Sequence, residues 1–436
     1  MEKTLNPRKI TFGVVEAVLD KKVPLDEALE TAFSKNPDLE VRDRALVKHL
    51  TTTLFRHLGA IDSAMGKWLK KPLPTRAVWV RHWMRIGAAQ ILFLNVPDHA
   101  AVNTTVAEIS GAKRSGASVF KNLANAILRN FVRNQKDILN DLEKNPEKNL
   151  PPWLRIHWEK SLGLEKLKKI AAAQVIQPPL DVVLKNPKDA GALLHPLDAK
   201  EVFKGVLRLR PRGLIENLPG FKEGKWWAQD LAASLPARLF GDVKGKAVLD
   251  LCAAPGGKTL YLASRGAYVI AVDKSRPRLE RLKENLARTG LEATIVCSDV
   301  FNFTAEKGFD HILLDAPCSA TGTLRRHPDV AFQRNLKTIA RLASLQTKML
   351  DHSFSLLKTG GILVYCVCSL EATEGEDIIE TFLKANKSAK RQPITPGELE
   401  DHKEWVTPDG DLRTLPSDMS DDGGMDGFFA ARLVKT

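Results

Sequence analysis

The sequence predicts an α/β protein in which a Rossmann-like domain with a parallel sheet follows an all-α domain and a small α+β subdomain. In the C-terminal half, short apolar runs alternate with helical patterns, as in a parallel sheet with crossover helices. A glycine-rich turn separates the first of these runs from its helix. In the N-terminal third, apolar residues recur at helical spacing. We therefore expect three parts, comprising residues 1–144, residues 145–225 and residues 226–436.

Four strand-like runs in the C-terminal part define the expected sheet. Three of them end in an aspartate, namely Asp273, Asp299 and Asp315. Ligands of open parallel sheets bind beyond the carboxyl ends of the strands, where an acid can bond the two hydroxyls of a ribose. A single aspartate there is most simply a solvated loop residue, but three in register indicate a ligand site. The runs comprise residues 248–251, 267–273, 293–299 and 309–315.

Two further elements are expected in this part. Apolar residues at helical spacing predict a helix over residues 276–289, which closes at Gly290. Residues 425–433 form an apolar run after a polar loop. This run suits the antiparallel pair at the edge of such a sheet.

The glycine-rich turn joins the first strand to its helix and is a candidate ligand site. Small residues let the backbone approach a ligand closely, and the free N–H groups of the following helix favour an electron-rich partner. A phosphate-binding loop needs glycine where Cys252 stands, and the dinucleotide fingerprint needs a third glycine that is missing. Glycines at such a turn are also often purely structural. The turn consists of Cys252, Ala253, Ala254, Pro255, Gly256, Gly257, Lys258 and Thr259.

The N-terminal part carries the positive charge of the chain. Helical spacing predicts helices over residues 41–58, 78–94 and 118–131. Residues 1–225 hold 38 Lys and Arg against 24 Asp and Glu, whereas residues 226–436 hold 27 against 28. This asymmetry suits an arm that binds the phosphates of a polyanion, although a basic surface without a partner has the same composition. Basic residues gather around the third helix, at Lys113, Arg114, Lys121, Arg129 and Arg133.

The middle part begins with residues 145–152, a polar and proline-bearing stretch that is typical of an interdomain linker. A short helical pattern follows at residues 165–174. Strand-like runs such as residues 180–184 then alternate with loops. We expect a small α+β subdomain beside the sheet.

Composition excludes several classes of protein. The chain has 436 residues, a formal charge of +13 and five cysteines, which is an odd number. No charged start leads into an apolar signal, and no apolar run approaches the ~18 residues of a membrane span. We therefore expect a cytoplasmic protein without disulfides. The Cys-x-Cys pair at Cys366 and Cys368 could suggest zinc, but no second pair is present, so we expect no metal.

Three motifs give this sequence a family resemblance. The turn at residues 252–259, the segment Asp315-Ala316-Pro317-Cys318 and the pair Cys368-Ser369 resemble those of the NOL1/NOP2/Sun family of RNA cytosine-5 methyltransferases. The resemblance covers nearly the whole chain and is strongest over residues 226–326 and 360–377. The N-terminal half resembles the NusB-like RNA-binding domain that some members carry.

The resemblance implies a domain that binds S-adenosyl-L-methionine. By motif, Asp273 would bind the ribose, Asp299 would lie on the adenine side, and Asp315 would lie near the sulfonium and the target base. Gln229 and Asp230 match the helix that leads into this domain, and we assign them an architectural role. The implied cofactor residues are Cys252, Ala253, Ala254, Pro255, Gly256, Gly257, Lys258, Asp273, Asp299 and Asp315.

The chemistry of this family explains the need for two thiols. C5 of cytosine attacks a methyl group only after a thiolate has added to C6, which divides one hard step into two easier ones. The C5 proton must then leave and the thiol must be expelled, so a second group beside the base takes part. The resemblance implies that Cys368 is the nucleophile, that Cys318 assists product release and that Asp315 bonds the cytosine ring.

The other cysteines have competing interpretations. Spacing alone does not choose between Cys366 and Cys368, because both would point to the same face of a strand. The serine after Cys368 decides for that residue by family pattern. Val367 stands where the family commonly has threonine, so a hydroxyl contact there is in doubt. We interpret Cys252 and Cys297 as small buried hydrophobes.

Two rival functions stay open. DNA cytosine methyltransferases also attack C6, but their nucleophile is the cysteine of a Pro-Cys motif, which here would be Cys318. Only the second cysteine, Cys368, distinguishes an RNA methyltransferase from a DNA methyltransferase. A ribosome-assembly factor could bind RNA without turnover, but it would have no chemical need for either thiol. The resemblance points to 16S ribosomal RNA before subunit assembly as the substrate, and we expect a monomer. The middle part would help to clamp the RNA, and Arg325, Arg326 and His327 would meet its phosphates.

Overall fold

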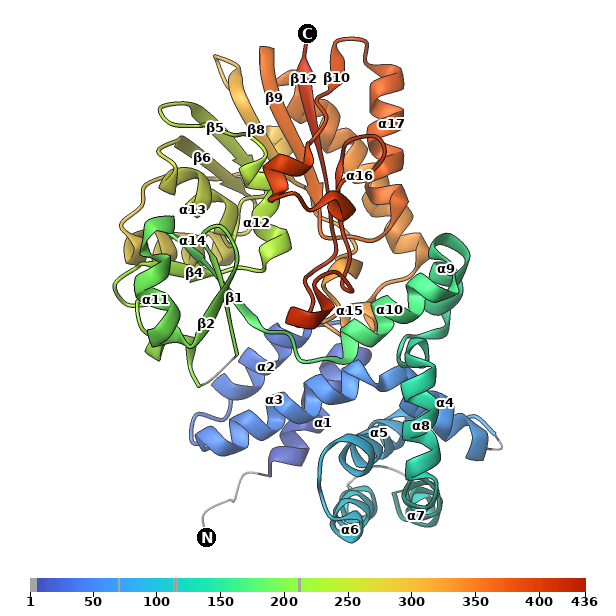
Figure 1. Cartoon of the computed structure of the whole chain (residues 1–436). Helices are drawn as coiled ribbons and strands as arrows, with labels where there is room; N and C mark the ends of the chain where they lie inside the picture. The colour runs from blue at the N-terminus through green and yellow to red at the C-terminus, as the bar shows by residue number, and fades with distance from the viewer. Residues whose placement is uncertain (1–5, 70, 113, 115–116, 211–212) are drawn as a thin grey trace. The chain divides into compact units, whose positions relative to one another are not determined.

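A computed structural model describes residues 6–436 apart from residues 70, 113, 115–116 and 211–212. The chain forms two compact units (Figure 1). One comprises Met1–Ile176 with Leu324–Asn335, and the other comprises Gln177–Thr323 with Leu336–Thr436. The expected division into three parts stays a prediction, because compactness alone does not show which parts fold independently.

The first unit is helical throughout its described part, as the sequence predicts. Its three expected helices are present, although the first is divided at His57 into α3 and α4. They are amphipathic, and their apolar faces build one core that includes Leu54, Phe55 and Phe131. The helices are α1 (Pro7–Leu19), α2 (Leu25–Ser34), α3 (Val41–Arg56), α4 (Leu58–Trp68), α5 (Val78–Phe93), α6 (Asp98–Ser110), α7 (Ala117–Arg133), α8 (Gln135–Lys144), α9 (Pro152–Leu162), α10 (Leu164–Val175) and α15 (Val330–Gln333).

Residues 145–152 are folded, so the prediction of a polar linker there is wrong. They form the short helix η2 (Pro146–Asn149) and the start of α9. Asn149 is buried, and its Oδ1 lies 2.9 Å from Nδ1 of His57. A Cβ at Gly59 would collide with the carbonyl of Leu150, so only glycine permits this close approach. Tertiary contacts therefore override the local loop signal.

Residues 324–335 belong to the helical unit although they follow the Pro-Cys motif in sequence. The backbone N–H of Leu25 donates to Oδ2 of Asp329 at 3.1 Å, and Nε1 of Trp153 donates to the carbonyl of Ala331 at 3.1 Å. Arg325 is 0 % exposed, and His327 pairs with Asp26 at 3.3 Å. The prediction of a phosphate-binding loop is thus wrong for Arg325. Of the predicted basic cluster, Lys113 lies outside the described residues.

The second unit begins with a small antiparallel sheet, which matches the expected α+β subdomain. Its strand order is β2-β3-β1-β4, and α11 (Ala190–Leu197) packs on it through a separate apolar cluster. The strands are β1 (Leu180–Leu184), β2 (Ala199–Phe203), β3 (Val206–Leu209) and β4 (Trp226–Ala228).

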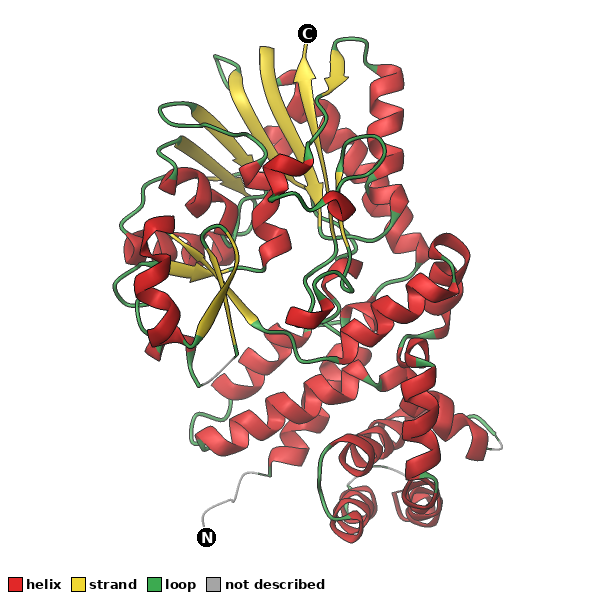
Figure 2. Ribbon diagram, viewed as in Figure 1, coloured by secondary structure: helices red, strands yellow, loops and turns green. Residues whose placement is uncertain are grey.

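The large sheet of this unit is Rossmann-like, and Figure 2 shows its strands in yellow. Its order is β10-β12-β9-β8-β5-β6-β7, with β11 also pairing with β12. Neighbours from β7 to β9 are parallel, whereas β12 runs antiparallel to β9 and β10. The expected C-terminal strand is therefore present as β12, which forms the antiparallel pair at the edge of the sheet together with β10. The strands are β5 (Ala247–Leu251), β6 (Tyr268–Asp273), β7 (Thr294–Cys297), β8 (Phe309–Asp315), β9 (Leu357–Val367), β10 (Ala389–Arg391), β11 (Leu412–Thr414) and β12 (Phe428–Lys435).

Helices cover both faces of the large sheet. Successive strand residues point to opposite faces, so Val248 packs in one cluster with α12, α13 and α14, whereas Leu249 packs in another with α16 and α17. The predicted helix over residues 276–289 is confirmed, and Gly290 ends it with a φ of 59°. No helix in the described part of the chain is long and apolar enough to cross a membrane. These helices are α12 (Leu231–Arg238), α13 (Gly257–Ser264), α14 (Arg276–Thr289), α16 (Leu336–Ser355) and α17 (Glu376–Ala385).

Candidate active site

A cavity of about 400 Å³ lies at the carboxyl ends of the five parallel strands β5 to β9. This is the position at which open parallel sheets bind ligands. Most of the residues that line it come from the ends of the strands or from the loops that follow them, and α14 and α16 supply the others. They include six of the predicted site residues, namely Cys252, Asp273, Asp299, Asp315, Cys318 and Cys368.

The cavity brings two thiols together from loops 50 residues apart in sequence. Sγ of Cys318 lies 3.4 Å from Sγ of Cys368. The two cysteines follow β8 and β9, which are neighbouring parallel strands, so their carboxyl ends meet. The hydrogen bond with Cys368, together with burial, raises the pKa of Cys318 well above its ordinary value. Cys318 therefore stays a protonated thiol at neutral pH.

The structure separates Cys366 from Cys368, which the sequence spacing could not do. Cys366 is 0 % exposed, and its Sγ contacts Oδ1 of Asp315 at 3.5 Å. Burial, followed by the charge of Asp315, raises the pKa of this thiol. Cys368 lines the cavity, whereas Cys366 is not among the lining residues. Because Cys368 can reach a ligand in the cavity, the structure favours Cys368 over Cys366 as the candidate nucleophile.

The remaining cysteines differ from the sequence interpretation. Cys297 is exposed, so its prediction as a buried hydrophobe is wrong; it lies at the end of β7, an edge strand of the large sheet. Cys252 is half-buried and adopts a positive φ of 61° at the start of the glycine-rich turn. Burial raises the pKa of its thiol, and the charge of Asp315 adds to the effect.

An ion pair with the buried Lys258 holds Asp315 at the wall of this cavity. Nζ of Lys258 lies 2.8 Å from Oδ2 of Asp315 and 5.0 Å from the ring centroid of Phe428. Burial disfavours the charge on Lys258, but the nearby acidic groups, Asp315 first among them, together outweigh it and raise the pKa of the ammonium above its ordinary value. Asp315 therefore faces the cavity with a cation held behind it.

The glycine-rich turn shapes the wall of the cavity mainly through Cys252. Its next two backbone N–H groups are used inside the fold, since Ala253 donates to the carbonyl of Val272 and Ala254 donates to Oδ2 of Asp273, each at 3.1 Å. The peptide bond between Ala254 and Pro255 is cis. These hydrogen bonds fix the strand-end carboxylate of Asp273 beside the turn.

The glycines of the turn permit close packing. A Cβ at Gly256 would collide with Leu282 on α14, and a Cβ at Gly257 would lie 2.8 Å from Cδ of Gln229. Asp230 caps α12 by accepting from the N–H of Ala232 at 2.9 Å, and it also accepts from the N–H of Asp426 at 3.1 Å. These contacts support the architectural role assigned to Gln229 and Asp230.

Several residues of the cavity were not singled out from the sequence, and three of them bear on its chemistry. Arg278 lies on α14 and pairs with Asp273 at 3.6 Å. Phe301 follows Asp299, whose Oδ1 accepts from the N–H of Phe301 at 3.0 Å, and it is 40 % exposed. Met349 reaches the cavity from α16. A basic residue and an exposed aromatic residue just after strand-end acids are the signals that could have indicated the first two.

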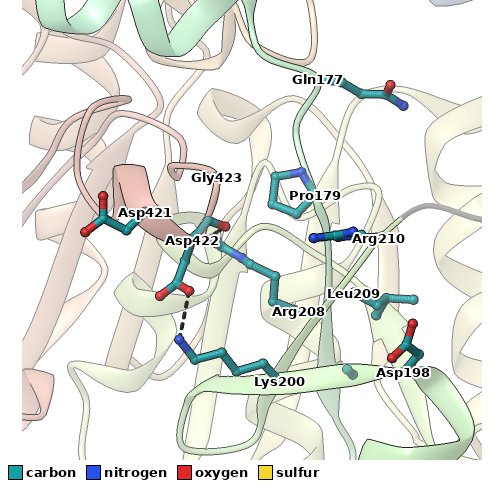
Figure 3. Close-up of a pocket in the computed structure, with 11 residues that line it drawn as sticks. Gln177, Pro179, Asp198, Lys200, Arg208, Leu209, Arg210, Asp421, Asp422 and Gly423 are labelled. Atoms are coloured by element: carbon teal, nitrogen blue, oxygen red, sulfur yellow. Dashed lines mark hydrogen bonds and ion pairs between the residues drawn. The ribbon is translucent and has the colours of Figure 1, made fainter.

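A second hollow of about 910 Å³ lies beside the small sheet (Figure 3). Its charged side chains bond mostly to neighbouring protein groups. Lys200 pairs with Asp422 at 2.8 Å, and Nη1 of Arg208 donates to the carbonyl of Asp422 at 3.1 Å. No thiol lines it, so the chemistry that the sequence predicts belongs to the smaller cavity.

The fold and the site together define a class of protein. A Rossmann-like sheet closed by antiparallel strands, with acids and paired thiols at its carboxyl ends, is that of an S-adenosylmethionine-dependent cytosine-5 methyltransferase of RNA. Comparisons with known proteins agree. Residues 239–434 match the model of the 16S rRNA methyltransferase RsmB/F family, and residues 5–133 match that of the NusB family.

Similar proteins cover the whole chain. It is 36% identical over 451 residues to the ribosomal RNA small subunit methyltransferase B of Pseudomonas syringae pv. tomato, covering 99% of this chain and 97% of that protein. It is 33% identical over 453 residues to the protein of the same name from Salmonella paratyphi B, covering 100% of each. The crystal structure of PH0851 has a TM-score of 0.74 at 22% identity, covers 100% of both chains and shows the same fold. The chain belongs to the RsmB/F family of 16S rRNA methyltransferases.

Proposed function

We propose that this chain transfers a methyl group to C5 of a cytosine in 16S ribosomal RNA, with Cys368 as the nucleophile and Cys318 assisting product release. The observation that carries the proposal is the pair of thiols 3.4 Å apart in a cavity that three strand-end aspartates also line. The names of the relatives, ribosomal RNA small subunit methyltransferase B, support this choice of RNA.

The residues of the cavity fit S-adenosylmethionine. A volume of about 400 Å³ is in the range of cofactor pockets, roughly 300–1,000 Å³. Asp273 would bond the ribose and Asp299 would lie on the adenine side, with the exposed ring of Phe301 beside it. The cofactor, when bound, supplies the methyl group.

The side chains of Cys368, Asp315 and Cys318 would carry out the remaining steps of the reaction. The thiolate of Cys368 forms a bond to C6 of cytosine, and the electron pair of the C5–C6 double bond becomes available at C5. Asp315, held by Lys258, would bond the cytosine ring at N3, where a proton passed through its carboxyl group neutralises the negative charge that the addition places on the ring. After methylation the C5 proton passes to solvent, the electron pair of the C5–H bond re-forms the double bond, and the C6–S bond breaks with its electron pair returning to the sulfur of Cys368. The protonated thiol of Cys318 lies beside Cys368 to assist this release.

Gel retention tests these roles. A transcript of small-subunit RNA is incubated with labelled S-adenosylmethionine and either wild type, Cys318→Ala or Cys368→Ala, then run under denaturing conditions. We expect Cys318→Ala to accumulate a methylated covalent adduct and to turn over about 10²–10⁴-fold more slowly, because it loses one proton-transfer or release group. Cys368→Ala should give neither adduct nor product.

The exposed Cys297 provides the matched control, and Cys297→Ala should behave as wild type. Methylation by Cys368→Ala would reassign the nucleophile to Cys366 or Cys318. Loss of label transfer in wild type would favour an RNA-binding assembly factor without turnover.

We further propose that the protein acts as a monomer in the cytoplasm. A single chain carries both thiols, the acids of the cavity and the NusB-like helices, so the site needs no residue from a second copy. Sedimentation of the purified protein, free and bound to RNA, measures its oligomeric state.

A further inference from the structure

Glu374 is a fully buried carboxylate that the proposed mechanism does not use. It ends the short helix η7 (Ala372–Glu374) and is 0 % exposed. Four donors converge on its two oxygens. The N–H of Ser319 donates to Oε1 at 2.9 Å, and Nε2 of Gln346 donates to the same oxygen at 3.0 Å. The hydroxyl of Ser369 donates to Oε2 at 2.6 Å, and the hydroxyl of Ser319 donates to it as well.

The donors have a common relation to the thiols. Ser319 directly follows Cys318, and Ser369 directly follows Cys368. The two serine hydroxyls also lie 3.1 Å from each other. Gln346, on α16, bonds the carbonyl of Pro317 at 2.9 Å, which directly precedes Cys318. The carboxylate thus joins both thiol-bearing loops at the residues next to the thiols.

Glu374 acts on the thiols rather than on a ligand, because it is not among the residues that line the cavity. Its carboxyl group accepts all four hydrogen bonds, which no neutral side chain of the same size can do, since glutamine carries only one acceptor oxygen. The hydrogen bond with Cys368 and burial raise the pKa of Cys318, and the charge of Glu374 adds to that effect. Glu374 therefore influences the position of both thiols and the protonation of one.

We infer that Glu374 is the positioning residue that holds the two thiols in place, Cys368 for attack on C6 and Cys318 for release of the resulting C6–S bond. This inference rests on the proposed function, because it gives Cys368 and Cys318 their separate steps. Both steps take place at one carbon of the target base, so the two thiols must hold a fixed separation. A misplacement of about 1 Å can cost about 10²-fold in rate.

The first test compares Glu374→Gln with Glu380→Gln. Both make the same chemical change in the segment after Cys368, but Glu380 is exposed on α17 and forms an ion pair with the exposed Lys384 at 3.4 Å. We expect Glu374→Gln to lower the single-turnover methylation rate by about 10²-fold. Its dissociation constant for S-adenosylhomocysteine, measured by calorimetry, should stay within about twofold of wild type, since the cavity lining is unchanged. Glu380→Gln should match wild type in both.

Two milder variants keep the test decisive if Glu374→Gln folds poorly. Ser369→Ala removes the hydrogen bond between the Cys368 loop and Glu374, so it should chiefly slow formation of the covalent adduct. Ser319→Ala removes the hydroxyl contact between the Cys318 loop and Glu374, so it should form the adduct at nearly the wild-type rate and accumulate it. A merely structural role would lower both steps together and would not produce this split.

The outcomes separate the two proposals. Wild-type methylation and the adduct of Cys318→Ala establish the function on their own. If these hold and Glu374→Gln methylates as fast as Glu380→Gln, the positioning role is wrong while the function stands. Equal losses of adduct formation and release in both serine variants would also overturn it. Failure of wild type to methylate would contradict the proposed function instead.

Discussion

Asp250, a residue of the large sheet, has a pKa far from the ordinary value of an aspartate. It lies on β5 with 0 % exposure, and its Oδ2 accepts from Oγ1 of Thr259 at 2.6 Å. Burial raises its pKa from 3.8 to about 7, the hydrogen bond from Thr259 opposes that change, and the charge of Asp315 adds to it. The folded protein therefore keeps a proton that the unfolded chain loses between these two pH values.

The sign of the pH dependence follows from this difference. Below about pH 4 both states are protonated, and Asp250 costs nothing in stability. Between about pH 4 and pH 7 the unfolded state binds fewer protons, so stability falls as pH rises and levels off above about pH 7. The full effect is roughly 4 kcal/mol at 1.36 kcal/mol per pKa unit.

We expect Asp250→Asn to remove this dependence, because the amide does not titrate. Measured as urea midpoints, the stability of Asp250→Asn relative to wild type should rise between pH 4.5 and pH 8. Other groups titrate equally in both proteins and cancel in the difference. A difference that is constant over this pH range would show that Asp250 does not hold its proton in the folded state.

Elements of the second unit are tied by an ion pair that joins two strands and a helix. Asp181 on β1 and Arg208 on β3 are cross-strand neighbours, with Nε to Oδ1 at 2.7 Å and Nη2 to Oδ2 at 2.8 Å. Oδ2 of Asp181 also accepts from the N–H of Leu231, the first residue of α12, at 3.0 Å. Their side chains are 0 % and 6 % exposed. The ion pair therefore links the small sheet to a helix that packs on the large one.

Removal of one partner should be costly. Asp181→Ala leaves a buried guanidinium without its carboxylate, so we expect a loss of about 3–5 kcal/mol in the free energy of unfolding. The double variant Asp181→Leu with Arg208→Met should recover most of that loss, because it leaves no buried charge.

The half-exposed pair of Asp310 and Lys358, which joins β8 to β9 at 3.0 Å, is the matched control. Asp310→Ala should cost about 1 kcal/mol or less. Similar urea midpoints for Asp181→Ala and Asp310→Ala would contradict the assigned importance of the buried pair.

In the whole molecule, the positive charge and the cavity lie in different parts of the chain. The excess of Lys and Arg lies in residues 1–225, while the part with the cavity is nearly neutral. On α7, Lys121, Arg129 and Arg133 are exposed. Arg114 is also exposed, but it packs over Phe12 and Trp79 and pairs with Glu16. The three cations of α7 are thus the better placed to meet phosphates.

We predict that Lys121→Gln with Arg129→Gln weakens RNA binding without changing sequence preference. Each lost phosphate contact should lower the slope of log affinity against log salt by about 1. Filter binding of the RNA transcript at several salt concentrations measures this slope. Lys283→Gln with Lys384→Gln, two exposed cations of the nearly neutral part, should leave it unchanged. Equal slopes for the two double variants would rule out α7 as a phosphate-binding surface.

The sequence by itself determined the features that depend on local pattern. Strands that end at Asp273 and Asp315, the helix that closes at Gly290 and the helices around residues 41–58 and 78–94 follow from periodicity and end signals between near neighbours. The motifs at Cys318 and Cys368 indicated the family, which the comparisons show.

Only the tertiary structure decided what depends on contacts between distant residues. It placed Cys368 at the cavity and buried Cys366, and it brought Glu374 to Ser319 across 55 residues of sequence. It also buried Arg325 and Asn149, for which local composition had predicted a phosphate contact and an interdomain linker. The physical reason is that burial and hydrogen bonding depend on which chain segments meet in space, and local periodicity carries no information about that.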